Sequence, residues 1–141
     1  MKTIAILISL FLAQQFQAQT NSNTTITVSV KNLESNEGAI IFGLYTEMTF
    51  MKAKPKYNAK SEIVDGIARI TFKNITPGDY AISCFYDKNG NGQMDFEPTG
   101  KPLESYGVSN NKMSPDGPPQ WKDAEFKVSG SPLKFNILLL R

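Results

Sequence analysis

Apolar and polar residues alternate along much of the chain, and this pattern predicts β-strands. In residues 25–31 the apolar side chains share one face and hydroxyl or charged side chains take the other, and residues 38–45 carry a similar run. Such alternation is typical of a strand with one buried face. The expected core positions in these two strands are Ile26, Val28, Val30, Ile40, Phe42 and Leu44.

Further strands are expected wherever the same pattern returns between turn signals. The dipeptide Asp65-Gly66 predicts a tight hairpin turn, and Pro77-Gly78 predicts a turn into the next strand. About seven strands at short spacing favour an all-β, antiparallel two-sheet sandwich of the prealbumin-like or Ig-like kind. The last of them is expected to be central and buried. The remaining predicted strands are residues 57–64, 67–72, 79–86, 123–128 and 133–140.

Two segments interrupt the alternation. Residues 47–53 are expected to form a helical turn or a flap that closes one end of the core. Residues 98–122 contain five prolines and three glycines, which excludes a long helix or strand. A loop of this length in a small domain often has a function, and it carries Tyr106 and Trp121. Both aromatic residues are candidate ligand contacts, although packing under the sheet is the favoured role for Trp121.

The amino terminus has the features of a secretory signal peptide. Lys2 precedes a short apolar run, and the chain turns polar at Gln14. The run is too short to span a bilayer, and no later segment is apolar enough to do so. We therefore predict a signal peptide over residues 1–18 and one β-sandwich domain over residues 19–141. The mature domain is expected to be exported.

Composition excludes several classes of function. Lys and Arg total 15 against 13 Asp and Glu, so no strong positive charge is present to favour nucleic acid. The chain has no His, which rules out Ser-His-Asp and Cys-His catalysis and His-bound zinc. Its single cysteine, Cys84, allows no internal disulfide and is expected to be a buried apolar residue.

Candidate metal ligands are concentrated in the segment that follows the strand 79–86. Oxygen-bearing side chains alternate with glycines, and Gly92 occupies the sixth position, where an EF-hand-type loop turns sharply. Calcium prefers six to eight oxygen ligands, which such a loop can supply together with a backbone carbonyl. The candidate ligands are Asp87, Asn89, Asn91, the carbonyl of Gln93, Asp95 and Glu97.

The match to a calcium loop is incomplete. Pro98 stands at the twelfth position, where an EF-hand has a bidentate Glu, and Glu97 comes one residue early. The segment also follows a strand instead of a helix. A glycine-rich Asn/Asp turn that holds no metal therefore remains an alternative interpretation.

Three sequence blocks, taken in order, resemble a secreted bacterial family known as domain of unknown function 2141. The blocks are residues 75–82, residues 87–95, and residues 100–111 with 117–126. The resemblance extends over nearly the whole mature chain and implies an exported, small β-domain, periplasmic or extracellular in a Gram-negative bacterium. It implies no reaction. The Pro-Gly-x-Tyr block at Pro77 also resembles transthyretin-like and carboxypeptidase-regulatory-like modules, which supports the fold only.

Three functions follow as expectations. The first is a non-catalytic module stabilised by calcium, with a glycan or another envelope protein as its partner. The second is a carboxylate-based hydrolase similar to a glycosidase, using two of Asp87, Asp95, Glu97 and Glu104. The third is a structural subunit that assembles through the apolar final strand.

Overall fold

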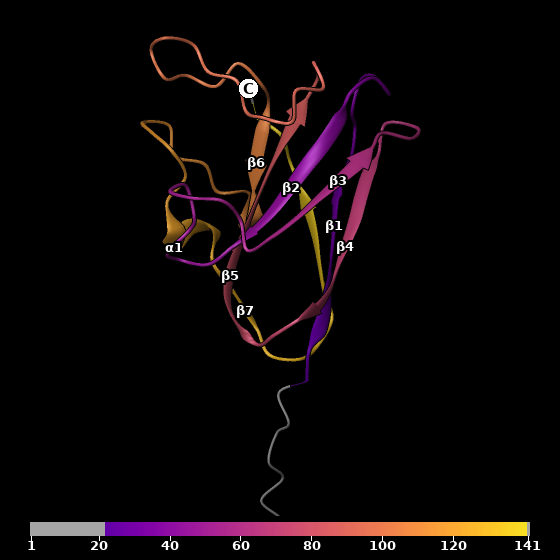
Figure 1. Cartoon of the computed structure of the whole chain (residues 1–141), viewed down its shortest axis with the longest axis vertical. Helices are drawn as coiled ribbons and strands as arrows, with labels where there is room; N and C mark the ends of the chain where they lie inside the picture. The colour runs from indigo at the N-terminus through magenta and orange to yellow at the C-terminus, as the bar shows by residue number, and fades with distance from the viewer. Residues whose placement is uncertain (1–21, 141) are drawn as a thin grey trace, which may run out of the picture.

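A computed structural model describes residues 22–140 as two β-sheets that pack face to face (Figure 1). One sheet has the order β4-β1-β8, and comprises β1 (Thr24–Val30), β4 (Ala68–Ile75) and β8 (Leu133–Ile137). The other has the order β3-β2-β5-β6, and comprises β2 (Ala39–Tyr45), β3 (Tyr57–Glu62), β5 (Gly78–Asp87) and β6 (Tyr106–Val108), with β7 (Phe126–Val128) also paired to β5. The expected all-β, two-sheet sandwich is confirmed. The expected signal peptide lies outside the described residues.

The core lies between β1 of one sheet and β2 and β5 of the other. All six apolar positions expected from the alternation in the first two strands are fully buried. Burial of one such side chain contributes about 1.5–3 kcal/mol before the entropy cost of ordering it. The sandwich is therefore held mainly by apolar contacts between strands that are distant in sequence.

Cys84 points into this core from β5 and is fully buried. Burial raises the pKa of its thiol to about 12, and the backbone of Gly107 lowers it only in part. A thiol that stays protonated is a poor nucleophile. Cys84 is a core residue, as its place in the alternation predicts.

The turn at Asp65-Gly66 forms as expected, but the hairpin does not continue beyond it. Both residues have positive φ angles, 51° and 72°, which suit a type I′ turn. Val64 and Ile67 form one isolated antiparallel bridge, after which the flanking strands separate into different sheets. The turn therefore links the two sheets instead of closing a ladder within one of them.

The final strand was expected to be central, and this expectation is wrong. β8 lies at the edge of the three-stranded sheet and runs parallel to β1. The chain crosses from β7 to the other sheet through residues 129–132, so β8 starts at the same end as β1. Asn111 covers part of this edge, since its amide donates to the Asn136 carbonyl and accepts from the Leu138 N–H.

Residues 98–122 form short elements only. Besides β6, they include a 3-10 turn, η1 (Ser109–Asn111), and the start of a one-turn helix, α1 (Trp121–Ala124). Trp121 packs edge-on against Phe50, with ring centroids 5.9 Å apart. Phe50 is buried in the turn that follows β2, in a second apolar cluster with Ala81 and Val108. Ala81 alternates with the core residues of β5, so the expected flap covers the outer face of the five-stranded sheet and not an end of the core between the sheets. No helix within residues 22–140 combines the length and apolar character needed to cross a membrane.

Candidate metal centre

The candidate ligand segment begins at the last residue of β5, at the upper end of the molecule in Figure 1. Asp87 pairs with Ala39 of β2 and is fully buried. The neighbouring Gly38 allows this close approach, since a Cβ there would lie 2.6 Å from the Asp87 carbonyl oxygen. The sheet therefore fixes the position of Asp87, and a carboxylate is brought into the protein interior.

Only one of the two Asp87 carboxylate oxygens has a hydrogen-bond partner. Oδ2 accepts from the N–H of Gly92 at 2.9 Å. Oδ1 is buried and accepts no hydrogen bond from the described residues. A buried carboxylate oxygen without a partner is costly, on the order of 1–3 kcal/mol or more for a charged group. This oxygen needs a positively charged or donating neighbour.

The loop after Asp87 is coiled by short side chain to backbone bonds. Asn89 Oδ1 accepts from the N–H of Asn91 at 3.2 Å, and Asn91 Oδ1 accepts from the N–H of Gln93 at 2.9 Å. The glycines at 90 and 92 have φ angles of 74° and 75°, which most other residues avoid. Each amide oxygen keeps a second lone pair after accepting one bond. The coiling therefore leaves both oxygens able to bind a cation.

The Asp95 carboxylate closes the loop by accepting hydrogen bonds from the side-chain amides of Asn89 and Asn91. Asn89 Nδ2 donates to Asp95 Oδ2 at 2.7 Å, and Asn91 Nδ2 lies 3.0 Å from both carboxylate oxygens. The structure thus brings Asn89, Asn91 and Asp95 together in the loop that follows the buried Asp87. In this arrangement the amide groups partly offset the charge of Asp95, as they would in a turn that holds no metal.

Glu104 contacts this loop at Asp95, and it is not among the metal ligands predicted from the sequence. Its Oε2 accepts from the N–H of Asp95 at 3.3 Å, while its Oε1 is buried and has no hydrogen-bond partner among the described residues. The next residue, Ser105, accepts from the N–H of Tyr86 in β5. Contact between β5 and the segment before β6 therefore places Glu104 beside the loop, which spacing in the sequence does not reveal.

The pKa of Glu104 is raised above its ordinary value. The main cause is burial, and the charges of Asp95 and Asp87 raise it further. The N–H of Asp95, which donates to Oε2, lowers the pKa, and so does the nearby N–H of Lys88, which does not reach hydrogen-bond geometry with either carboxylate oxygen. Glu104 therefore lies close enough to Asp95 and Asp87 for their charges to act on it, and a cation near Glu104 would offset this repulsion.

The two remaining candidate ligands are placed differently. Glu97 accepts from the Thr99 hydroxyl at 3.3 Å, within a separate turn closed by its own backbone bonds to residues 100 and 101. Gln93 is exposed, and only its backbone carbonyl was expected to bind. Neither side chain joins the contacts that link Asp87, Asn89, Asn91, Asp95 and Glu104.

The donor set determines which cation fits this site. Within residues 22–140, no three His, Cys, Asp or Glu side chains form a metal-binding group by themselves. A cation here would have to combine carboxylate oxygens with amide and backbone oxygens. That mixture suits calcium, which accepts irregular oxygen coordination, better than zinc or magnesium. A depression of about 500 Å³, lined by Asn89, Asp95, Phe96 and Glu104 among others, gives solvent access.

Comparison with known families gives one result. A family model described as "Uncharacterized protein conserved in bacteria (DUF2141)" matches residues 28–136, which is well over half of the chain. The chain belongs to the DUF2141 family. The match agrees with the resemblance seen in the sequence and extends from β1 to β8. Searches among curated proteins and among solved structures found no match.

Proposed function

We propose that this DUF2141 chain is an exported, non-catalytic β-sandwich module whose loop between Asp87 and Asp95 binds one calcium ion. The observation that carries the proposal is the buried Asp87, whose Oδ1 has no hydrogen-bond partner among the described residues, at the start of the loop in which Asn89, Asn91 and Asp95 are linked. Calcium would connect this loop to Glu104 and so fasten the segment between β5 and β6. For an exported domain without an internal disulfide, such binding energy adds directly to folding stability.

The geometry supports this role over the hydrolase alternative. A glycosidase needs one carboxyl with a raised pKa that can reach its substrate. Glu104 has the raised pKa, but Oε2 accepts a backbone hydrogen bond and Oε1 is buried. A carboxyl held in this way is better placed to bind a cation at the loop than to protonate a sugar.

A calcium titration followed by NMR amide shifts tests the proposal. We expect a single site, with the largest shifts at the amides of residues 87–95, and a Kd of about 0.1–1 mM, as for other extracellular calcium modules. Asp95→Asn should weaken binding at least about ten-fold, since it removes a charged ligand. Glu62→Gln is the matched control, because Glu62 is an exposed carboxylate on β3, outside the loop.

Two results would overturn the proposal. The first is an absence of shifts in the loop at 10 mM calcium. The second is a pattern of small shifts spread over all surface carboxylates and equal in both variants, which would indicate weak general association of the ion.

A further inference from the structure

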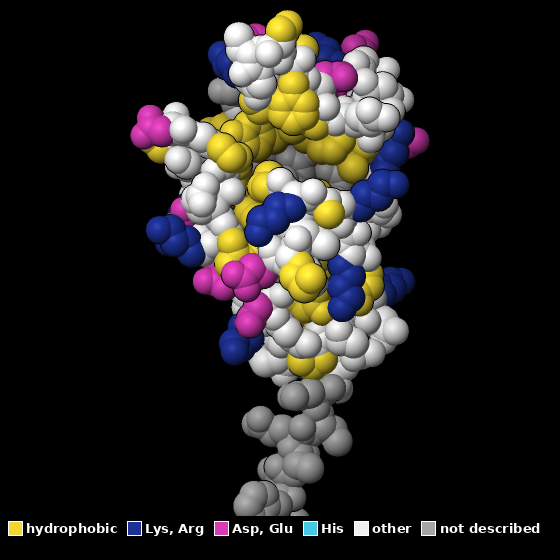
Figure 2. Space-filling model, turned by 60° about the vertical axis from the view of Figure 1, so that its left-hand side comes forward, with side chains coloured by type: hydrophobic (Ala, Val, Ile, Leu, Met, Phe, Trp, Pro, Cys, Tyr) yellow, Lys and Arg dark blue, Asp and Glu magenta, His cyan; other side chains and the backbone are white. Residues whose placement is uncertain are grey.

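A large groove lies on the solvent-facing side of the five-stranded sheet. Its volume is about 1170 Å³, more than twice that of the depression at the calcium loop. Ser83 and Phe85 of β5 and Tyr106 of β6 form its floor. These positions alternate with the core residues Ile82 and Cys84, so they face away from the core. Figure 2 shows the hollow, with hydrophobic side chains above and below it.

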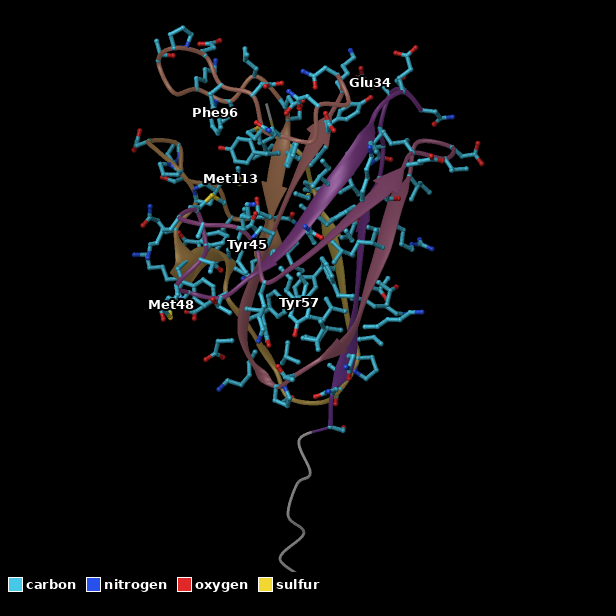
Figure 3. The ribbon with its side chains drawn as sticks, in the orientation of Figure 1. Glu34, Tyr45, Met48, Tyr57, Phe96 and Met113 are labelled. Atoms are coloured by element: carbon cyan, nitrogen blue, oxygen red, sulfur yellow. The ribbon has the colours of Figure 1, made fainter. Side chains whose placement is uncertain are left out.

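Three separate segments build the walls of this groove. Residues 94–102 form one wall, residues 113–119 a second, and residues 51–53 a third. Figure 3 shows Phe96, Met113 and Tyr45 one above another on the same side of the molecule, each from a different segment. The proline- and glycine-rich segment 98–122 therefore contributes to two of the walls, and the turn after β2 supplies the third.

The walls are apolar and adaptable. Met51, Met94 and Met113 come from the three walls, and flexible methionine side chains fit ligands of irregular shape. Phe96 is 57% exposed and lines the same groove as the three methionines. A hollow lined mainly by apolar side chains is typical of a ligand site.

The charged residues that line the groove are basic. Lys52 and Lys101 come from different walls, and no Asp or Glu among the described residues lines it, although the Glu97 carboxylate accepts from the hydroxyl of the lining residue Thr99. Since the whole chain has nearly equal numbers of acidic and basic residues, a lining with only basic ones favours an anionic group in the ligand. An apolar interior with a positive rim is complementary to an apolar body that ends in a negative charge.

We propose that this groove binds an amphipathic anion of the fatty-acid class. The acyl chain lies against Phe85, Phe96 and the methionines, and the carboxylate lies near Lys52 and Lys101. The volume is on the scale of sites that enclose a ligand of drug size or slightly larger. This inference goes beyond calcium binding and does not require it.

Fluorescence of cis-parinaric acid, a fatty acid that emits in apolar sites, tests the proposal on the mature chain. The titration is run once in calcium and once in chelator, and saturable binding in either state is the expected result. Dodecanoate should displace the probe at least about ten-fold better than dodecanol, a difference of about 1.4 kcal/mol. Dodecyltrimethylammonium should not compete.

Two variants measure separately how the lysines at the rim and the apolar wall contribute to ligand binding. Lys52→Glu combined with Lys101→Glu should weaken dodecanoate at least about ten-fold and leave dodecanol unchanged. Phe96→Ser should weaken both ligands. Lys60→Glu, an exposed change on β3 outside the groove, should alter neither. Thermal unfolding of each variant confirms that it is folded.

Three outcomes would overturn the proposal. Failure of cis-parinaric acid to bind in both states would exclude a fatty-acid site. Equal displacement by dodecanol and dodecanoate would indicate a groove for neutral lipid. Dimerisation that is abolished by Phe96→Ser would show that a second copy of this chain fills the groove instead.

Discussion

The interior of the sandwich and its loop-built upper end are stabilised in different ways. Between the sheets, apolar side chains from β1, β2 and β5 are fully buried. At the upper end, side-chain hydrogen bonds coil residues 87–95, and the carboxyl groups of Asp87 and Glu104 each have one buried oxygen without a partner in the described part of the chain. Apolar packing does not respond to ions, whereas carboxyl groups do. Calcium and pH should therefore act on the upper end and leave the interior unaffected.

The largest expected effect comes from the interior. Phe42→Ala removes a fully buried ring from β2 and should cost about 3–5 kcal/mol of unfolding free energy, because it leaves a cavity. Urea unfolding measures this loss, which should be the same in calcium and in chelator. A loss that differs between the two conditions would show that the interior and the loop are coupled. This result would contradict the expectation that calcium leaves the interior unaffected.

An effect of intermediate size is expected in the loop. Gly92 has a φ angle of 75° and donates to Asp87, so Gly92→Ala should cost about 1–2 kcal/mol from backbone strain alone. Calcium binding should weaken in parallel. Gly117→Ala is the control, since a Cβ there meets nothing within 4 Å and Gly117 has no positive φ angle. Equal unfolding curves for the two variants would contradict this account of the loop.

Glu104→Gln should have opposite effects with and without calcium. In chelator, ionised Glu104 is partly buried near Asp87 and Asp95, so removing its charge should raise the melting temperature at neutral pH, by no more than about 2 °C because solvent screens a half-exposed group. In calcium the same change should lower it, because a ligand charge is lost. A variant that shifts stability in the same direction in both conditions would count against Glu104 as part of the site.

The difference in stability between the native chain and Glu104→Gln should change with pH in one direction. Because the folded pKa of Glu104 is raised, its ionised form costs stability above that pKa. In chelator, the cost should fall as the pH drops through the folded pKa and should vanish below the unfolded value. The difference in melting temperature between the native chain and Glu104→Gln should therefore shrink from pH 7 to pH 4. A difference that grows on acidification would contradict the raised pKa.

The smallest effect is expected from Met48→Ser. Met48 is 85% exposed in the turn after β2, so its loss should change the unfolding free energy by less than about 0.5 kcal/mol. Differential scanning calorimetry checks this value. A larger loss would mean that this turn packs more closely than its exposure indicates.

The sequence predicted those parts of the molecule that depend on local patterns. Alternation identified the buried faces of β1 and β2, and the Asn/Gly spacing identified the coiled loop. Features that depend on distant contacts were not predicted. Glu104 reaches the loop only because Ser105 bonds to Tyr86 of β5, and the edge position of β8 follows from the chain crossing between sheets. The groove also required three separate loops to come together.

The most direct test of the central claim is the melting temperature of the unsubstituted protein in 10 mM calcium and in excess chelator. A bound ion at 10 to 100 times its Kd should stabilise the fold by about 1.4–2.7 kcal/mol. For a domain of this size, the melting temperature should then be about 5–10 °C higher in calcium. Identical melting temperatures in the two solutions would contradict the claim that the loop at Asp87 binds calcium.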